Sequence, residues 1–200
     1  VTKITAEDKQ RGKMYLEQKQ RVELQKTTTD LDEYLKKLNI KLFIKNADEF
    51  SIPRISQLTL KTNQFNLTTK RYQESDIKKI SDNDEYIVGC AQVEDKFGDN
   101  GITGVFIINK INSKEWFIDT FLLSCRVMGR EVEKAILGHI INLAKEHNVE
   151  LIKTQFLSSQ KNKPIEDFLP NCGFKKDGDY WYYTLKTPFI IPDYLEVNME

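Results

Sequence analysis

Hydrophobic residues recur with two different periods along this chain of 200 residues. Short apolar or alternating runs predict strands at 40–44, 86–96, 102–111, 116–123, 150–157 and 180–185. Helical spacing predicts helices at 52–65, 74–80, 130–147 and 161–171. An Asn-Gly step within residues 98–101 predicts the hairpin between the second and third strands. This order of elements predicts an α+β fold around a central mixed sheet.

Residues 1–38 have a different pattern, with many charged and few apolar side chains. A capping-box sequence begins at Thr5 and starts a predicted helix that reaches Lys26. Three threonines at 27–29 interrupt it, and a short second helix follows at 30–38. With so few apolar residues, this part needs another surface to pack against. We therefore expect residues 1–38 to form a helical connector and residues 39–200 to form the main domain.

The composition excludes several classes of partner. The chain has 30 acidic and 30 basic residues and no basic stripe with interleaved aromatics, so we expect no nucleic-acid partner. No apolar run approaches the ~20 residues needed to cross a bilayer, and we expect no membrane association. Three widely spaced cysteines, Cys90, Cys125 and Cys172, indicate reduced thiols in a cytoplasmic protein and no metal site.

The turn at residues 124–131 is the strongest candidate for chemistry. It joins an apolar strand to the longest predicted helix, so unpaired backbone N–H groups and the positive end of the helix dipole meet there. Such a turn suits a phosphate or pyrophosphate. Arg126 and Arg130 either bind this anion or are solvated arginines of a helix cap. Cys125 is either a nucleophile, its thiolate favoured by these arginines, or a small residue packed between strand and helix.

A second segment, residues 54–72, is dense in amides, hydroxyls and cations and contains neither Gly nor Pro. Lys61, Asn63, Gln64 and Asn66 either orient a polar substrate or cap the preceding helix and tie it to the sheet. Elsewhere, Asp119 is either a catalytic base or a buried acceptor on the strand that leads to the turn.

The two histidines have simpler interpretations. His139 flanks the apolar stripe of the long helix and is expected to be a packed core residue. His147 lies in the last turn of that helix, where a cation suits the dipole.

The order of elements resembles that of the GNAT acetyltransferase fold. The run 126–131 resembles the GNAT signature Arg/Gln-x-x-Gly-x-Gly/Ala, and Asn162 with Phe168 and Gly173-Phe174 resembles a later GNAT element. The resemblance implies that the turn binds the pyrophosphate of coenzyme A and that the pantetheine arm lies between the fourth and fifth strands. The implied cofactor-binding residues are Arg126, Val127, Met128, Gly129, Arg130 and Asn162.

The sequence departs from the GNAT pattern at two positions. Glu131 occupies the last signature position and brings a negative charge close to the anion site. Leu169 stands near the position of the tyrosine that often serves as general acid, and it has no proton to donate.

Residues 54–72 also closely resemble a signature of FkbH-like proteins, roughly R-x-x-Q-L-x-x-K-T-N-Q-F-N-L-T-T-R-R-Y. Further matches lie at 6–8, 14–15, 95–101, 118–121, 124–126, 129–130 and 133. In that family a HAD-type phosphatase domain (subfamily IIIC) precedes a GNAT-like domain. The chain has no Asp-x-Asp-x-Thr/Val phosphatase motif, so we expect it to be the C-terminal, GNAT-like part.

The FkbH-like resemblance implies a function in methoxymalonyl extender-unit synthesis. The family takes a glyceryl group from a phosphoglycerate donor and loads it onto the thiol of an acyl carrier protein. Cys125 then carries the acyl group as a thioester, and the group bound at the turn is the carrier's phosphopantetheine or coenzyme A. Two alternatives stay open: a non-catalytic module that docks the carrier protein, and an acetyl-CoA-dependent N-acyltransferase.

Overall fold

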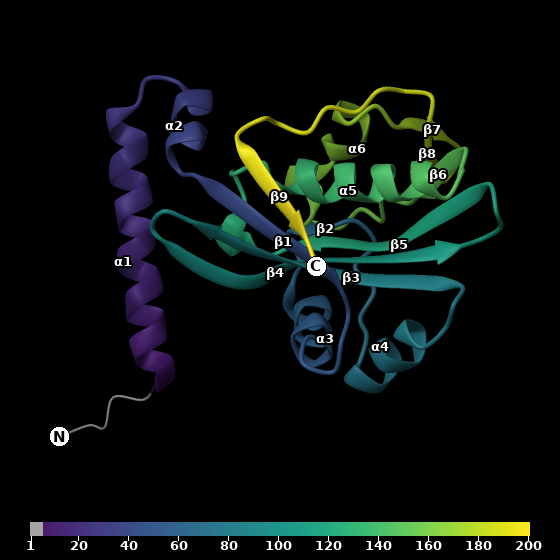
Figure 1. Ribbon diagram of the computed structural model, residues 1–200, viewed down its shortest axis with the longest axis horizontal. Helices are drawn as coiled ribbons and strands as arrows, with labels where there is room; N and C mark the ends of the chain where they lie inside the picture. Colours follow the sequence, from purple (N-terminus) through teal and green to yellow (C-terminus); the bar gives the residue numbers. More distant parts are fainter. Residues whose placement is uncertain (1–5) are drawn as a thin grey trace.

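The computed structural model describes residues 6–200, which form one mixed sheet with helices on both faces (Figure 1). Two helices come first, α1 (Ala6–Thr27) and α2 (Leu31–Lys37). The predicted capping box begins at Thr5, which lies outside the described residues. Both helices of the predicted connector are present, and α2 places Tyr34 and Leu35 in the main core. Whether they connect a further domain stays a prediction.

Nine strands within residues 6–200 build the sheet. Eight of them lie in the order β7-β8-β6-β5-β4-β3-β1-β9, and β2 pairs with β5 off this path. Only β1–β9 and β5–β6 are parallel pairs in the described part of the chain. The strands are β1 (Ile40–Asn46), β2 (Phe65–Asn66), β3 (Tyr86–Asp95), β4 (Gly98–Lys110), β5 (Glu115–Leu123), β6 (Leu151–Thr154), β7 (Lys175–Asp177), β8 (Tyr180–Thr184) and β9 (Leu195–Met199).

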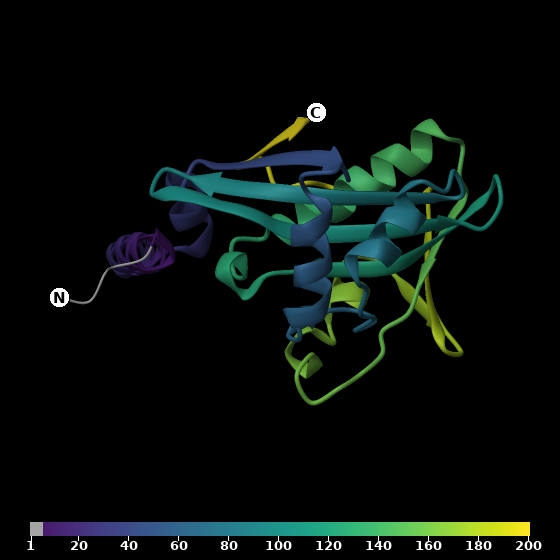
Figure 2. The same cartoon turned by 90° about the horizontal axis from the view of Figure 1, so that it is seen from below.

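Helices cover the two faces of the sheet separately (Figures 1 and 2). The long helix α5 (Val132–Glu146) packs its apolar stripe on one face, together with the short α6 (Phe168–Asn171). On the other face lie α3 (Ile52–Lys61) and α4 (Glu74–Ser81), which bury Ile55 and Ile77 against alternate residues of β3 and β4. The predicted α+β fold is confirmed. None of the helices in residues 6–200 is long and apolar enough to span a membrane.

The hairpin between β3 and β4 turns at Lys96-Phe97, not at the predicted Asn-Gly step. Asp95 pairs with Gly98, and the Asp95 carboxylate accepts hydrogen bonds from the backbone N–H groups of Phe97 and Gly98. Asn100 and Gly101 instead lie inside β4, at an irregularity in the register with β3. Gly101 has a φ of 70°, which glycine adopts without the usual steric cost. The Asn-Gly step therefore makes a bulge.

Three other predicted boundaries were wrong. The helix expected at 52–65 ends at Lys61, because Thr62 is extended and the chain enters β2. The helix expected at 161–171 is divided into a 3-10 turn, Lys163–Ile165, and α6. The strand expected at 150–157 is shorter, since the chain leaves β6 after Thr154. The short strands β2, β7 and β9 were not predicted.

The strand β2 occupies a special position between β5 and the chain that follows β6. Parallel pairing of β5 with β6 stops at Ile118 and Thr154. Beyond that point, β2 pairs with β5 through Phe65–Leu123 and Asn66–Leu122. Leu67 continues the connection, donating its N–H to Phe121 and accepting one from Leu157. The gap where the fourth and fifth predicted strands separate is thus filled by the protein's own backbone.

Candidate functional site

The predicted turn lies where β5 ends and α5 begins. The Ser124 side chain caps a single 3-10 turn, Cys125–Val127, and accepts a hydrogen bond from the N–H of Arg126. Gly129 has a φ of 84°, and open space surrounds the position where a Cβ would stand. Glu131 also has a positive φ, 61°, directly before α5. The backbone therefore reverses sharply at Gly129 and leaves that glycine accessible to a ligand.

Cys125 is exposed and lies between two cavities that share only Cys125 and Arg126 among their lining residues. We name them by the helices beside them. The α3 cavity, of about 360 Å³, is lined by Arg54, Leu58, Lys61, Thr62, Asn63, Gln64, Phe65, Leu123, Ser124, Cys125 and Arg126. The α1 cavity, of about 400 Å³, is lined by Met14, Gln18, Arg21, Gln25, Tyr34, Asn100, Cys125, Arg126, Met128, Gly129 and Arg130. The exposed thiol is inconsistent with the alternative of a packed small residue.

The α3 cavity collects cations from both predicted motifs. Arg54, Lys61 and Arg126 line it, and no acidic residue is among the lining residues that the structure describes. Burial, together with repulsion from Arg126, lowers the pKa of Arg54 below its ordinary value. Arg54 is held by the carbonyl of Ile102 and by the side chain of Gln57. A cavity with three cations and no balancing acid suits a small anion such as a carboxylate or a phosphate.

The amide-rich segment 54–72 contributes some side chains to the α3 cavity and others to the internal hydrogen bonds of the fold. Lys61, Asn63 and Gln64 line the α3 cavity, as predicted for substrate-binding residues. The fourth predicted residue, Asn66, is fully buried, and its amide bonds the backbone of Thr62 and Thr69. Asn66 therefore ties β2 to the preceding helix and is closed to a substrate. The binding roles of the other three residues stay predictions.

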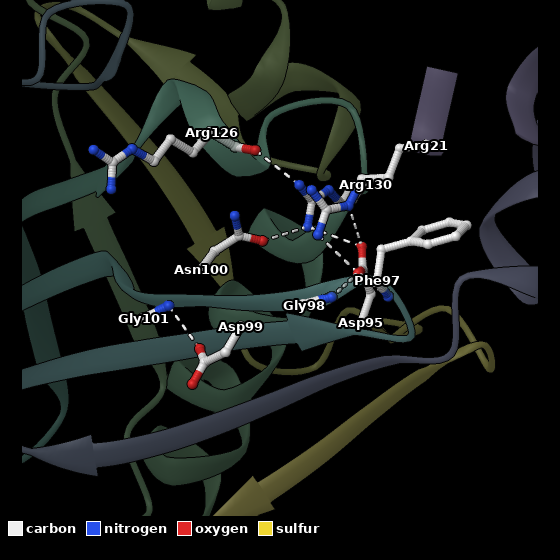
Figure 3. A network of polar contacts seen from close by, with 9 residues as sticks. All are labelled: Arg21, Asp95, Phe97, Gly98, Asp99, Asn100, Gly101, Arg126 and Arg130. Atoms are coloured by element: carbon white, nitrogen blue, oxygen red, sulfur yellow. Dashed lines mark hydrogen bonds and ion pairs between the residues drawn. The ribbon is translucent and has the colours of Figure 1, made fainter. Parts of the chain in front are cut away.

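The α1 cavity has buried cations that are already paired. Arg21 of α1 donates to both carboxylate oxygens of Asp95, at 2.6 and 2.8 Å. Arg130 donates to the same carboxylate at 3.2 Å, to the side chain of Asn100 at 2.8 Å and to the carbonyl of Arg126 at 2.9 Å. Figure 3 shows both guanidinium groups directed towards the Asp95 carboxylate, with the side chain of Arg126 directed away from them. The buried arginines therefore join α1, the hairpin and the turn.

Arg130 is consequently placed differently from the prediction. Its side chain is 4% exposed and makes three hydrogen bonds within the protein. Burial, followed by the nearby charge of Arg21, lowers its pKa to about 10. Val127, another predicted cofactor residue, is completely buried in the core. Within the turn, Arg126, Met128 and Gly129 are the predicted residues left open to a ligand.

Asn162 is also closed to a cofactor in this structure. It is fully buried and donates to the carbonyls of Asn66 and Leu157 while accepting from the N–H of Ser159. Its amide joins β2 to the chain that follows β6. Asn162 thus stabilises the closed strand gap, and a ligand in this gap would have to displace these contacts.

Asp119 is an acceptor held by three side chains. Lys70 and Tyr72 each bond its carboxylate at 2.6 Å, and Thr120 bonds it at 2.9 Å. Burial and the adjacent carboxylate raise the pKa of Tyr72 well above its ordinary value. Asp119 lines neither cavity beside Cys125 and lies about 17 Å from Ser124 along the extended strand. As the base for Cys125, Asp119 is therefore badly placed, and the alternative of a structural acceptor agrees with the contacts.

The remaining predicted side chains have structural surroundings. His139 is half-buried against Phe106, and burial lowers its pKa, as expected for a packed histidine. His147 bonds the carbonyl of Leu143 at the end of α5. Burial raises the pKa of both Cys90 and Cys172 to about 11, so these thiols stay protonated at neutral pH.

The two departures from the GNAT pattern have clear surroundings. The carboxylate of Glu131 contacts the hydroxyl of Tyr194 and the ammonium of Lys134, which compensates its charge beside the turn. Leu169 is buried in the main core, so no proton donor stands at that position.

Two site residues were missed by sequence reasoning. Arg54 lines the α3 cavity, and Arg21 anchors α1 beside the turn. Arg54 belongs to the quoted signature and was detectable as its first cation. Arg21 lies in a helix full of charged residues, and its partner Asp95 is 74 residues away, so the sequence carries no local signal for it.

Similarity to known proteins lies in the fold. No protein-family model matches the chain, and no curated protein matches it in sequence. Solved structures do match. Spermidine N-acetyltransferase from Vibrio cholerae, in complex with CoA and spermine, superposes with a TM-score of 0.58 at 12% identity, covering 72% of this chain and 96% of that one. The chain has the GNAT fold.

Two further GNAT structures give the same result. The ribosomal-protein-S18-alanine N-acetyltransferase from Escherichia coli has a TM-score of 0.56 at 10% identity, with 74% of this chain and 96% of that chain covered. A GNAT-family acetyltransferase from Staphylococcus aureus Mu50 also has a TM-score of 0.56, at 15% identity, with 72% and 99% covered. At these identities the similarity establishes the fold and leaves the reaction to be argued from the site.

Proposed function

We propose that this GNAT-fold domain is an acyltransferase that passes a glyceryl or related acyl group to the thiol of an acyl carrier protein, as part of an FkbH-like protein. The observation that supports this most is the position of Cys125. It is an exposed thiol next to three cations and the amide-rich segment, which come from distant parts of the sequence.

The chemistry follows from the charges around Cys125. Arg54, Lys61 and Arg126 line the cavity beside Cys125 and hold the negative charges of an acyl phosphate donor. The thiolate attacks the acyl carbon, a C–S bond forms, and the C–O bond to phosphate breaks with its electron pair leaving on phosphate. The thiol of the carrier's arm, when bound, gives its proton to solvent and attacks the carbonyl carbon of the thioester as a thiolate. Cys125 then leaves as the thiolate that it was before the cycle.

The residues of the turn fit the phosphate of a phosphopantetheine arm, whereas the strand gap does not fit the arm itself. Gly129 has an accessible backbone, and the Arg126 side chain makes no hydrogen bond or ion pair with another described residue. The gap between β5 and β6 is filled by β2 and closed by Asn162. Arg126 and Gly129 would therefore hold the phosphate.

Intact-mass measurement of the full-length protein tests the proposal. After incubation with 1,3-bisphosphoglycerate, whose 3-phosphate the phosphatase domain of the full-length protein hydrolyses with water to release inorganic phosphate, the wild type is expected to gain the mass of one glyceryl group. A carrier protein added later is expected to remove it. Cys125→Ser should gain no such mass, whereas Cys172→Ala should behave as the wild type because that thiol is half-buried and protonated. Glyceryl loading of the carrier that is unchanged in Cys125→Ser would contradict the proposal.

An acetyl-CoA-dependent N-acyltransferase is a second candidate, favoured by the shared fold and by solved structures of similar fold that are in complex with CoA. Leu169 and the filled strand gap weigh against it. Calorimetric titration with acetyl-CoA, followed by amine turnover, separates the two candidates. Tight binding with amine acetylation that persists in Cys125→Ser would support the second.

A third candidate, a docking module without chemistry of its own, makes a separate prediction. Carrier-protein binding should then be intact while Cys125 carries no acyl group under any condition. The same mass measurement, combined with a binding assay on Cys125→Ser, identifies this outcome.

A further inference from the structure

The two cavities beside Cys125 differ in the ligands that they suit. The α3 cavity has three cations without an acid, whereas the buried cations of the α1 cavity are neutralised by Asp95. A small, multiply charged phosphoglycerate matches the first. The second offers amides on one helix face and two methionines, which match a longer chain of amide and methylene groups.

The strand gap offers no alternative path for such a chain. Backbone pairing between β2 and β5 uses the hydrogen-bonding groups of β5 on that side, from Phe121 to Leu123. The fully buried amides of Asn66 and Asn162 hold β2 in place. An arm that reaches Cys125 must therefore approach over the surface of the turn.

On this basis we propose that α1 forms half of a second binding site, in which the α1 cavity receives the pantetheine arm while the α3 cavity receives the acyl donor. Gln18 and Gln25 of α1 contact the amides of the arm, Met14 and Met128 contact its methylene groups, and Gly129 faces its phosphate. The inference rests on the proposed function in one respect, the identity of the two ligands.

This arrangement gives Cys125 a position between donor and acceptor. Because the two cavities share only Cys125 and Arg126, the thiol receives the acyl group from one side and presents it to the other. The two ligands then need not exclude each other. The helix that the sequence indicated as a connector becomes a wall of the acceptor site.

Protection of Cys125 from alkylation measures this without any acyl transfer. The full-length protein is treated with iodoacetamide, and the modified Cys125 peptide is quantified at increasing concentrations of pantetheine 4′-phosphate or of 3-phosphoglycerate. Gln18→Ala combined with Gln25→Ala is expected to raise the pantetheine 4′-phosphate concentration needed for half protection about fivefold and to leave that of 3-phosphoglycerate unchanged. Lys61→Ala should give the opposite pattern.

Controls make the result specific. Gln20→Ala and Lys79→Ala change exposed residues of the same types outside both cavities and should affect neither ligand. In a calorimetric titration, saturating 3-phosphoglycerate should change the Kd of pantetheine 4′-phosphate by less than about threefold. Direct competition, loss of arm protection in Lys61→Ala, or no protection by the arm in the wild type would each overturn the inference.

The outcome is separate from that of the proposed function. If the wild type shows the two protection patterns but never forms an acyl-Cys125, the two-site inference holds and the thioester mechanism fails. If acyl-Cys125 forms but both ligands depend on Lys61, or both depend on Gln18 and Gln25, the mechanism holds and the inference fails.

Discussion

The α1 and α3 cavities lie on opposite sides of one cysteine, and their cations have different environments. In the α1 cavity, Arg21 and Arg130 are buried and share the carboxylate of Asp95. In the α3 cavity, Arg126 is exposed and its side chain bonds no other described residue. Arg126 and Arg130 belong to the same turn, four residues apart. Their difference teaches that an arginine motif indicates an anion site only where the protein supplies no anion of its own.

The largest expected effect on stability comes from removing the carboxylate that the two buried arginines of the α1 cavity share. Asp95→Ala leaves two buried guanidinium groups without a carboxylate and removes the acceptor of the hairpin turn, so it should lower the free energy of unfolding by about 3–5 kcal/mol. Asp99→Ala is the matched control. Its exposed carboxylate contacts Gly101 and Gln92, and its loss should cost about 1 kcal/mol or less. Urea unfolding measures both, and similar losses would contradict the assigned difference.

The next effect concerns Arg126 in the α3 cavity and the binding of an anionic ligand there. Arg126→Ala should weaken binding of 3-phosphoglycerate about tenfold, because a charge-assisted contact is lost, and should change the free energy of unfolding by less than about 0.5 kcal/mol. Calorimetric titration and urea unfolding of the same sample provide the two values. Arg126→Lys, which keeps the charge without the planar fork, should fall between. A stability loss as large as that of Asp95→Ala would remove the distinction between the two arginines.

A third prediction examines the carboxylate of Glu133, one oxygen of which is buried without a hydrogen bond among residues 6–200. Burial and the nearby Glu131 raise the pKa of Glu133, and its Oε2 accepts no hydrogen bond within residues 6–200. Because the folded pKa lies above the unfolded one, ionised Glu133 destabilises the fold at neutral pH, and stability is regained as pH falls through the folded pKa towards 4.5. Glu133→Gln should therefore raise the free energy of unfolding by about 1 kcal/mol at pH 7.

The pH dependence is the decisive part of that measurement. The advantage of Glu133→Gln over the wild type should shrink steadily in urea unfolding curves recorded from pH 7 downwards. His139 acts in the opposite direction, since burial lowers its pKa and its protonation below 6.5 favours the unfolded chain, but it is present in both proteins and cancels in the difference. An advantage that is constant with pH would exclude ionisation as its cause.

The smallest expected effect is at the contact between α1 and the hairpin. A Cβ at Gly98 would lie 2.2 Å from the carboxyl carbon of Glu17, so Gly98→Ala must displace that side chain. We expect a loss of about 1 kcal/mol or less, together with weaker protection of Cys125 by pantetheine 4′-phosphate and unchanged protection by 3-phosphoglycerate. Glu17→Ala should relieve the clash in a double-mutant cycle. Additive losses would show that the two residues do not meet.

The elements with strong local patterns could be predicted from the sequence. Strand β5, the turn and helix α5 follow from an apolar run, an Arg-x-x-Gly step and an apolar stripe, all of which are local properties. The possible substrate role of Lys61 and Asn63 came from their residue types, and the sequence did not predict that they lie beside Cys125. The structure brings these residues into one cavity.

The wrong predictions share a physical cause, which is competition from distant contacts. The hairpin turn forms at Lys96-Phe97 and not at the Asn-Gly step. Asp95 caps the turn at Lys96-Phe97 while it binds two arginines from elsewhere in the chain. Strand β2 has only two residues, too few to show a period of two, and it depends on Asn162 from 96 residues away. Local sequence contains neither partner.

The contact of Arg21 with Asp95 also holds α1 at one point along its length. Arg21 lies fifteen residues from Ala6, so the described helix extends about 22 Å from this fixed point on its N-terminal side. A tilt of about 10° would move that end by about 4 Å and the contact itself very little. A large displacement at one end is thus converted into a small rotation beside Gln18 and Gln25, where the helix faces Cys125. Such a tilt of α1 would change the shape of the α1 cavity beside Cys125.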